Sequence, residues 1–163
     1  MNNKTIHPRR KHLRLRTYDY SASGAYFVTI CTHERRCLLG EIIEGKMLLN
    51  QLGEIVAEEC RRLAGIRPHI SVDMFVVMPN HVHIILFIDQ TVDTEPMKLG
   101  QIVRLFKGRV VRRIRQSGYD LFSWQRGYYD HVIRGEKGLQ RIREYVVNNP
   151  AKWEEDRNNP NLL

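Results

Sequence analysis

The chain of 163 residues has few cysteines and no long apolar segment. No hydrophobic run approaches the roughly 20 residues that a membrane-spanning helix requires. The basic N-terminus, residues 1–16, is not followed by the apolar stretch of a secretory signal. The number of cysteines is odd, and the spacing of Cys31, Cys37 and Cys60 is not that of a metal site. We therefore expect reduced thiols in a cytoplasmic protein that has no membrane partner.

Acidic residues are missing from two stretches that are rich in Lys and Arg. The net charge is +8 and the isoelectric point is about 9.7. Clustered cations indicate a polyanion partner, most simply a nucleic acid. The alternative is a tail and a solvated helix face, and the pattern does not separate DNA from RNA. The cations are Lys4, Arg9, Arg10, Lys11, Arg14 and Arg16 in the first stretch, and Lys98, Arg104, Lys107, Arg109, Arg112, Arg113 and Arg115 in the second.

Length and hydrophobic content predict the domain organisation. A chain of this length with 42% hydrophobic residues suits one globular domain with a real core. The sequence contains neither internal repeats nor low-complexity segments. Residues 1–20 are expected to form a flexible basic arm, and residues 21–163 a single domain.

Hydrophobic periodicity predicts the order strand, hairpin, helix, strand, strand, helix, strand, helix. Pro79-Asn80 is a turn dipeptide between two strands, and Pro150 ends the last helix near Asn149. This order favours an α+β fold, in which helices pack on an antiparallel sheet of the ferredoxin-like type. The expected strands are 25–31, 70–78, 81–88 and 124–134, the expected hairpin is 41–49, and the expected helices are 51–65, 98–116 and a last one that ends near residue 149.

Two histidines begin the strand at 81–88. His81 and His83 are two residues apart, so both imidazoles project from the same face of the strand. The rest of the strand is apolar on both faces, which predicts a central strand that is covered on both sides. Two imidazoles side by side at one end of such a strand are suited to bind one metal ion together. The alternative is two structural histidines whose hydrogen bonds are satisfied.

A tyrosine and an amide follow on the last helix. Tyr145 and Asn149 are four residues apart and therefore share a face of that helix. Each also has a structural alternative. Tyr145 would be an aromatic residue of the core, and Asn149 would be the terminal residue of the helix before proline. Combined with the histidine pair, they would provide three ligands of a hard divalent ion and one nucleophile. The ion would polarise a phosphodiester, and the tyrosine hydroxyl would attack its phosphorus.

These motifs resemble those of the single-tyrosine HUH transposases, and more closely those of the bacterial REP-associated tyrosine transposases. The similarity extends over most of the chain. The separation of His83 and Tyr145, 145 − 83 = 62 residues, also suits that family. The matching segments are 14–20, 26–29, 76–83, 106–107, 124–125, 131–134 and 145–153.

The resemblance implies an HUH endonuclease domain that cuts and rejoins single-stranded DNA beside hairpins. The family's tyrosine becomes linked to the 5′ phosphate and leaves a free 3′ hydroxyl, so Tyr145 is the expected nucleophile. His81, His83 and Asn149 are the expected ligands of Mg²⁺ or Mn²⁺. Asn149 stands where many insertion-sequence relatives have a glutamine, which is one methylene longer. The implied protein is bacterial and nucleoid-associated, and acts as a monomer or a homodimer.

Cations and aromatic rings are the candidates for DNA contact. Lys and Arg side chains would meet phosphates, and rings would stack on unpaired bases. Strand packing is the alternative for Trp124, Tyr128 and Tyr129. His131 would orient phosphate or assist proton transfer, or it is structural. The candidate residues are Arg14, Arg16, Arg104, Lys107, Arg109, Arg112, Arg113, Trp124, His131 and Arg134.

Two other functions stay open from sequence. One is a nucleic-acid-binding regulator that does not cut, although the intact His-x-His and Tyr-Asn pairs argue against lost chemistry. The other is a metal-dependent phosphodiesterase that uses water as its nucleophile. Trapping of a covalent protein–DNA adduct would separate this phosphodiesterase from a transposase.

Overall fold

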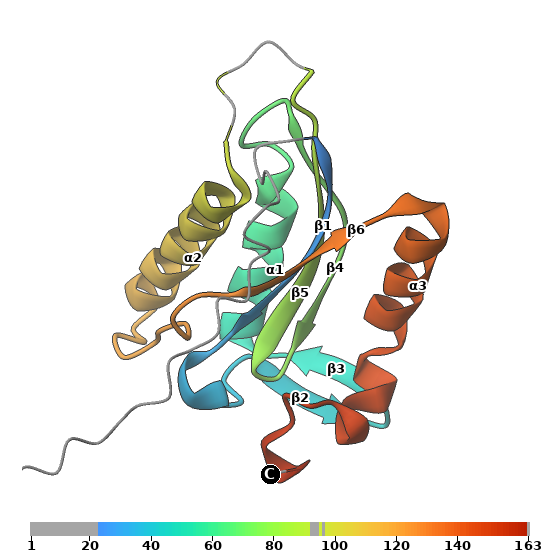
Figure 1. The fold of residues 1–163 in the computed structure, drawn as a ribbon. Coiled ribbons are helices and arrows are strands. Elements are labelled where there is room, and N and C mark those ends of the chain that lie inside the picture. Colours follow the sequence, from blue (N-terminus) through green and yellow to red (C-terminus); the bar gives the residue numbers. More distant parts are fainter. Residues whose placement is uncertain (1–22, 92–94, 96, 163) are drawn as a thin grey trace, which may run out of the picture.

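Four strands form one antiparallel sheet that organises the domain (Figure 1). The computed structural model describes residues 23–91, 95 and 97–162. The strands of this sheet are β1 (Gly24–Cys31), β4 (Ile70–Met78), β5 (His81–Ile88) and β6 (Tyr129–Ile133). The helices are α1 (Gln51–Leu63), α2 (Leu99–Gln116) and α3 (Gly135–Asn148), with the 3-10 helices η1 (His33–Arg35), η2 (Pro150–Glu155) and η3 (Pro160–Leu162).

The strand order is β4-β5-β1-β6, and each neighbouring pair is antiparallel. This order, with helices between β1 and β4 and between β5 and β6, is that of a ferredoxin-like fold. The predicted fold class is therefore confirmed. β5 is a central strand and is buried over nearly its whole length, as its two apolar faces predicted.

Helices cover both faces of the sheet, but unequally (Figure 1). α1 and α2 pack on one face and enclose the larger hydrophobic cluster, which includes Tyr26 and Phe106. α3 packs on the other face over a small cluster that consists of Ile85, Ile133, Leu139 and Val146. His81, His83 and Ile85 are two residues apart along β5, so their side chains share one face of the sheet, the face that α3 covers.

A short hairpin stands at the end of the sheet where β4 turns into β5. It consists of β2 (Gly40–Ile43) and β3 (Lys46–Leu49), as predicted. Its two turn residues, Glu44 and Gly45, have φ values of 50° and 72°. Positive φ at both positions is typical of a type I′ turn, which matches the twist of the flanking strands. β3 contacts η2, so the hairpin supports the C-terminal segment that follows α3.

The strand predicted at 124–134 is shorter than expected. β6 begins at Tyr129, and Trp124 forms only an isolated bridge with Thr32. In the intervening chain, Gln125 N–H still donates to the Cys31 carbonyl of β1 (2.8 Å), but two carbonyls face α2. Lys107 Nζ donates to the carbonyl oxygens of Gln125 (2.7 Å) and Gly127 (3.0 Å). Sequence periodicity does not reveal such a capping lysine from another element.

The predicted arm at residues 1–20 lies outside the residues that the structure describes. Within the described part of the chain, no helix has the length and apolar character needed to cross a membrane. The three cysteines are unpaired, with Cys31 and Cys60 buried and Cys37 exposed.

Candidate active site

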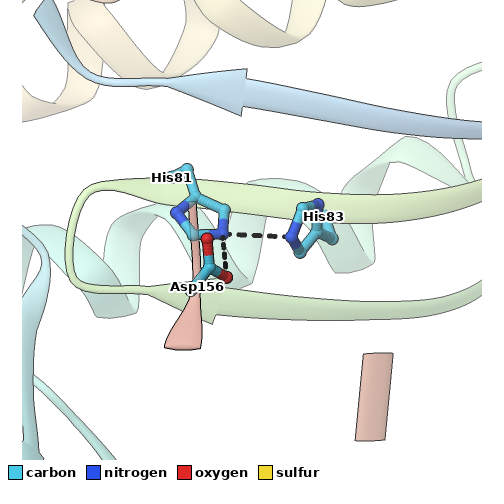
Figure 2. Close-up of side chains that lie close together, drawn as sticks. All are labelled: His81, His83 and Asp156. Carbon is cyan, nitrogen blue, oxygen red and sulfur yellow. Dashed lines mark hydrogen bonds and ion pairs between the residues drawn. The ribbon is translucent and has the colours of Figure 1, made fainter. Parts of the chain in front are cut away.

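The two histidines of β5 meet edge to face, and Figure 2 shows their rings side by side. His81 Nε2 lies 3.0 Å from His83 Nε2, and both side chains are buried. The β-strand places them there because the side chains of residues i and i+2 share a face. The two imidazoles therefore lie side by side, as their spacing predicted, while their role as metal ligands stays a prediction.

Each imidazole is oriented through its other nitrogen. Asn80 Oδ1 lies 2.8 Å from His81 Nδ1, and Thr29 Oγ1 lies 2.8 Å from His83 Nδ1. An amide oxygen can only accept, so His81 Nδ1 carries the proton and its Nε2 has a free lone pair. The Thr29 hydroxyl can donate or accept, so it is compatible with either tautomer of His83. Such partners are typical of histidines that bind metals through Nε2.

A carboxylate that was not predicted faces the pair. Asp156 Oδ2 lies 3.8 Å from His81 Nε2, and the ligand atoms of Asp156 and the two histidines all lie within 4.8 Å of one another (Figure 2). Asp156 is 6% exposed. Its Oδ1 accepts from the backbone N–H of Asn158 (2.7 Å) and its Oδ2 accepts from Asn149 Nδ2 (2.9 Å).

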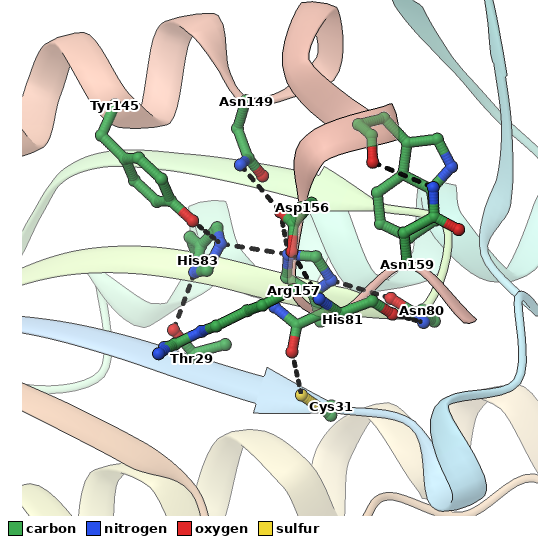
Figure 3. Close-up of polar contacts among 12 residues, drawn as sticks. Thr29, Cys31, Asn80, His81, His83, Tyr145, Asn149, Asp156, Arg157 and Asn159 are labelled. Atoms are coloured by element: carbon green, nitrogen blue, oxygen red, sulfur yellow. Dashed lines mark hydrogen bonds and ion pairs between the residues drawn. The ribbon is translucent and has the colours of Figure 1, made fainter. Parts of the chain in front are cut away.

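The segment that follows α3 brings Asp156 over the sheet (Figure 3). η2 begins at Pro150 and turns the chain back toward β5. Asn80 Nδ2 donates to the carbonyl oxygen of Asn158 (2.8 Å), and the Trp153 ring lies 6.1 Å from the His81 ring. Asn80 therefore orients His81 through its oxygen and holds the C-terminal segment through its nitrogen.

Tyr145 reaches the histidines from α3. Its hydroxyl lies 3.5 Å from His83 Nε2, and its ring meets Phe27 edge-on at 5.9 Å. The side chain is 43% exposed, so the hydroxyl is near both the buried pair and solvent. Burial raises the pKa of the Tyr145 phenol, the Asp156 charge raises this pKa further, and the Arg157 charge lowers it. At neutral pH the group is a protonated phenol.

Burial also sets the protonation of the histidines. It lowers the pKa of His81 to about 4, although the Asp156 charge opposes this shift. It lowers the pKa of His83 as well, and the charges of His81 and Arg157 act in the same direction. Both imidazoles are therefore neutral near pH 7, which is the form that binds a metal ion.

Asn149, the predicted third ligand, is buried beside the cluster. It caps α3 with helical backbone angles, so it lies one turn beyond Tyr145 as predicted. Its amide nitrogen faces Asp156, and its Oδ1 is buried without a hydrogen-bond partner among the described residues. A buried oxygen of this kind suits a ligand. Direct metal coordination by Asn149 stays a prediction, and Asp156 is added to the candidate ligands.

The donor set fits a hard divalent ion. Two neutral imidazoles and one carboxylate converge, Asn149 adjoins the carboxylate, and the Nδ1 atoms of both histidines already have hydrogen-bond partners. Carboxylate and amide oxygens are ligands that Mg²⁺ and Mn²⁺ favour, and imidazole is acceptable to Mn²⁺. Thr29 and Asn80 were also missed as site residues, because nothing in their own residue type distinguishes an orienting hydroxyl or amide.

A cleft of about 680 Å³ opens beside the cluster. It is lined by Tyr145, Asn149 and Asp156 and by residues of β6. His131 lines this cleft and is exposed. The structure therefore brings His131 close to Tyr145, while its role in phosphate or proton handling stays a prediction.

The predicted cations of α2 lie on the other face of the sheet. Arg109 Nε donates to Glu59 Oε2 (2.7 Å), and Arg113 Nη1 donates to Glu59 Oε1 (2.9 Å). Arg113 also pairs with Glu58. These two arginines thus join α2 to α1, whereas Arg104 and Arg112 line a shallow surface groove.

Of the other predicted DNA contacts, Lys107 and Trp124 line one surface pocket together with Arg112 and Arg115. Trp124 is 7% exposed and packs against Phe106 and Phe122, as the strand-packing alternative expected. Lys107 is half-buried by its two carbonyl partners, and Arg134 is exposed at the start of α3. Arg14 and Arg16 lie outside the described residues. DNA contact by any of these residues stays a prediction.

Comparison with known families gives a match over most of the chain. The family model described as "Transposase IS200 like" matches residues 21–149. A Haemophilus influenzae protein of unassigned function is 39% identical over 171 residues, which cover 94% of each chain. Another protein of the same organism, named for the REP-associated tyrosine transposases, is 23% identical and covers 82% of this chain and 74% of its own.

Solved structures share the fold. A REP-associated tyrosine transposase bound to a REP hairpin superposes with a TM-score of 0.62 and 22% identity, and the match covers 86% of this chain and 73% of that one. A protein of Deinococcus radiodurans R1, described as a transposase, gives a TM-score of 0.53 and 18% identity, with 83% and 95% covered. At these identities the structural matches support the fold alone.

Proposed function

Because the chain belongs to the IS200-like transposase family, we propose that it is a single-stranded DNA endonuclease and strand transferase. Its substrate is DNA with hairpins of the REP type, and its nucleophile is Tyr145. The reaction depends on a divalent cation, Mg²⁺ or Mn²⁺. We place it on bacterial chromosomal DNA in the cytoplasm, acting as a monomer or a homodimer.

One observation carries the proposal. The Tyr145 hydroxyl is 3.5 Å from His83 Nε2, which is itself 3.0 Å from His81 Nε2 and shares a cluster with Asp156. A tyrosine hydroxyl on α3 thus lies beside two imidazoles of β5 and a carboxylate that follows η2, a combination that suits a nucleophile next to a cation site. A regulator that does not cut has no use for this juxtaposition, so the geometry favours the enzyme.

Tyr145 would act by nucleophilic displacement at phosphorus. Its oxygen forms a bond to the phosphorus, and the bond from phosphorus to the 3′ oxygen breaks. The phenolic proton leaves to solvent, and the 3′ oxygen gains a proton to become a free hydroxyl. In the second half-reaction, a 3′ hydroxyl attacks the phosphotyrosine, which restores the phenol and joins the strands.

His81, His83 and Asp156 would hold the cation, with the Asn149 amide oxygen as a further ligand. Such an ion polarises a phosphate oxygen and stabilises the charge that develops on it. Thr29 and Asn80 would keep the two Nε2 atoms directed at the ion. Asn149 would also hold Asp156 in place through its amide nitrogen.

A trapping experiment tests the proposal. The protein is incubated with Mg²⁺ or Mn²⁺ and a library of genomic hairpin DNAs with single-stranded flanks, and adducts are captured under denaturing conditions. We expect the DNA segment with the 5′ phosphate to stay attached to Tyr145, and the other segment to be released with a 3′ hydroxyl. The captured strands are then sequenced, and the linked peptide is located by mass spectrometry.

The control variants are His81→Ala and His83→Ala, with excess chelator as a parallel condition. Adduct formation should be lost in all three, while hairpin binding remains. Full adduct yield in chelator would contradict the metal dependence. Retained hairpin binding without any adduct, by the unaltered protein, would favour the non-cleaving regulator, and cleavage without an adduct would favour the water-dependent phosphodiesterase.

A further inference from the structure

α3 rests on the sheet through a small apolar contact. Leu139 and Val146 are its buried residues, and they belong to the smaller of the two hydrophobic clusters. Ile142 packs against this cluster but is only partly buried. The same helix carries Tyr145, whose hydroxyl lies 3.5 Å from His83 Nε2. A polar contact that fixes this helix would therefore bear directly on the candidate site.

Such a contact joins α3 to β4. Arg143 Nε donates to Asp73 Oδ2 (2.9 Å), and Arg143 Nη2 donates to Asp73 Oδ1 (2.7 Å). A bidentate pair of this kind fixes the direction of both groups as well as their separation. The carboxylate of Glu136 is farther away, at 3.8 Å from Arg143 Nη1. The hydrogen bonds from Arg143 lower the pKa of the Asp73 carboxyl, so the pair stays charged at neutral pH.

A β-bulge presents Asp73 to the helix. The register of β4 against β5 shifts between Val72 and Met74, and Asp73 is the extra residue. Met74 packs against the cluster under α3, so strict alternation would direct Asp73 to the other face of the sheet. A bulge interrupts the alternation, because two residues of the bulged strand oppose one residue of its partner. Two adjacent residues of β4, one apolar and one charged, therefore both meet the α3 side.

Arg143 and Tyr145 lie on opposite flanks of α3. A helix turns by roughly 100° per residue, so residues two apart point to nearly opposite sides, and the apolar stripe of Ile142 and Val146 lies between them. Arg143 faces β4 at the edge of the sheet, whereas Tyr145 lines the cleft together with residues of β1 and β6. A rotation of α3 about its own axis would move both side chains. A tie at Arg143 therefore also limits the movement of the Tyr145 hydroxyl.

We infer that the Arg143–Asp73 pair is a positioning contact that sets the rotation of α3 and thereby holds the Tyr145 hydroxyl beside His83. Neither partner touches the reacting atoms, so both act through the helix. The inference rests on the proposed function, because the position of the hydroxyl affects chemistry only if Tyr145 is the nucleophile. A displacement of about 1 Å in a reacting group slows a reaction by roughly 100-fold. Both side chains are partly exposed, so the pair should contribute little to global stability.

A double-mutant cycle measures the contact. Arg143→Gln and Asp73→Asn each remove one charge, and a third protein combines them. The rate constant of adduct formation is measured at saturating hairpin DNA with Mn²⁺. Each single change should lower it by up to roughly 100-fold, and the double variant should lose no more than either single variant. DNA affinity and the unfolding midpoint should stay nearly unchanged. Fully additive losses, or no loss in either single variant, would overturn the inference.

Arg141 provides the matched control on the same helix. It is exposed, and no carboxylate of the described residues forms an ion pair with it. Arg141→Gln removes the same charge two residues from Arg143 and should leave the adduct rate unchanged. Arg143→Lys keeps the charge but not the planar fork, so its rate should lie between those of Arg143→Gln and the unaltered protein. Equal losses in Arg141→Gln and Arg143→Gln would overturn the inference.

The position of Tyr145 can be measured without DNA or metal. Its ring centre lies 5.9 Å from that of Phe27 and 5.4 Å from that of His83, so its NMR signals depend on where α3 lies. Tyr145→Phe removes the tyrosine signal and so assigns it. Arg143→Gln should shift the signal toward that of a solvent-exposed tyrosine and should speed hydrogen exchange in α3, whereas Arg141→Gln should do neither.

This measurement separates the contact from the proposed chemistry. A shifted signal without any adduct from the unaltered protein would support the contact and contradict the nuclease. An adduct together with an unmoved signal in both Arg143→Gln and Asp73→Asn would leave the proposed function standing and overturn the inference.

Discussion

The two faces of the sheet are built for different purposes. The face under α1 and α2 encloses an extensive apolar cluster, and its arginines are paired with Glu58 and Glu59. The face under α3 has only a small apolar cluster and instead carries buried polar groups, among them the histidine pair and Asp156. Apolar packing is therefore concentrated on one face, and the candidate site lies on the other.

This division explains why the charge pattern of the sequence is a poor guide to where an unpaired cation lies in the fold. The sequence places many cations on α2, yet Arg109 and Arg113 are engaged with acids from α1. Arg157, which belongs to no cationic run, lines the cleft beside the candidate site, and no carboxylate of the described residues forms an ion pair with it. A charge is available to a ligand only where the fold has not already neutralised it.

The largest expected effect separates two tyrosines that lie on opposite faces. Tyr145→Phe removes only a hydroxyl from the α3 face and should lower the rate of adduct formation by on the order of 10³-fold or more. Tyr128→Phe changes a ring that packs against the larger cluster and should leave that rate nearly unchanged. The measurement is the yield of adduct over time on a denaturing gel. An adduct that persists in Tyr145→Phe would place the nucleophile elsewhere.

A matched pair of leucines tests the difference in packing. Leu52 on α1 is 5% exposed and Leu139 on α3 is 8% exposed, so the two side chains are similarly buried. Leu52→Ala should cost about 4 kcal/mol of unfolding free energy and Leu139→Ala about 2 kcal/mol, because the smaller cluster relaxes more easily around the deletion. Denaturant unfolding measures both. Hydrogen exchange should also be faster in α3 than in α1, and equal costs with equal exchange would contradict the comparison.

Metal affinity should distinguish the roles of Asp156 and Asn149, the two polar neighbours of the histidines. Asp156→Ala removes a carboxylate and should weaken Mn²⁺ binding by about 100-fold, whereas Asn149→Ala should weaken it by about 10-fold, because water can replace an amide oxygen. Calorimetric titration with Mn²⁺ gives both values without any DNA. If Asn149→Ala were the more damaging change, Asn149 and not Asp156 would be the principal third ligand.

The smallest expected effect concerns neighbouring arginines of α2. Neutralising Arg109, Arg112 and Arg113 together should flatten the salt dependence of DNA binding if α2 meets DNA. Among the three, Arg112→Gln should account for most of this change, by about 0.7 in slope, since its side chain lines an open groove. Arg113→Gln should instead lower stability, because it leaves Glu58 without its partner and removes one of the partners of the buried Glu59. An unchanged slope in the triple variant would remove α2 from the DNA surface.

Much of the fold was predictable because its elements follow local rules. The periodicity of β4 and β5, the apolar stripe of α2 and the proline after α3 each depend on neighbouring residues. The limit of β6 was not predictable, because Lys107 on another element turns the carbonyls of Gln125 and Gly127 away from the sheet.

The candidate site was predictable where spacing alone determines direction. His81 and His83 share a face of one strand, and Tyr145 and Asn149 share a face near the end of one helix. Asp156 could not be found in this way. It stands in a run of acids and polar residues without periodicity, and its burial depends on bonds from Asn149 and Asn158.

Because Asp156 comes late in the chain, the candidate site becomes complete only late in synthesis. A ribosome makes the N-terminal part first, so both histidines, their orienting partners and Tyr145 are all made before Asp156. The four-stranded sheet is also complete in sequence before η2 begins. The carboxylate that completes the candidate site is therefore made after every strand of the sheet that carries the histidines. On the proposed function, translation itself delays the first moment at which the protein can cut DNA.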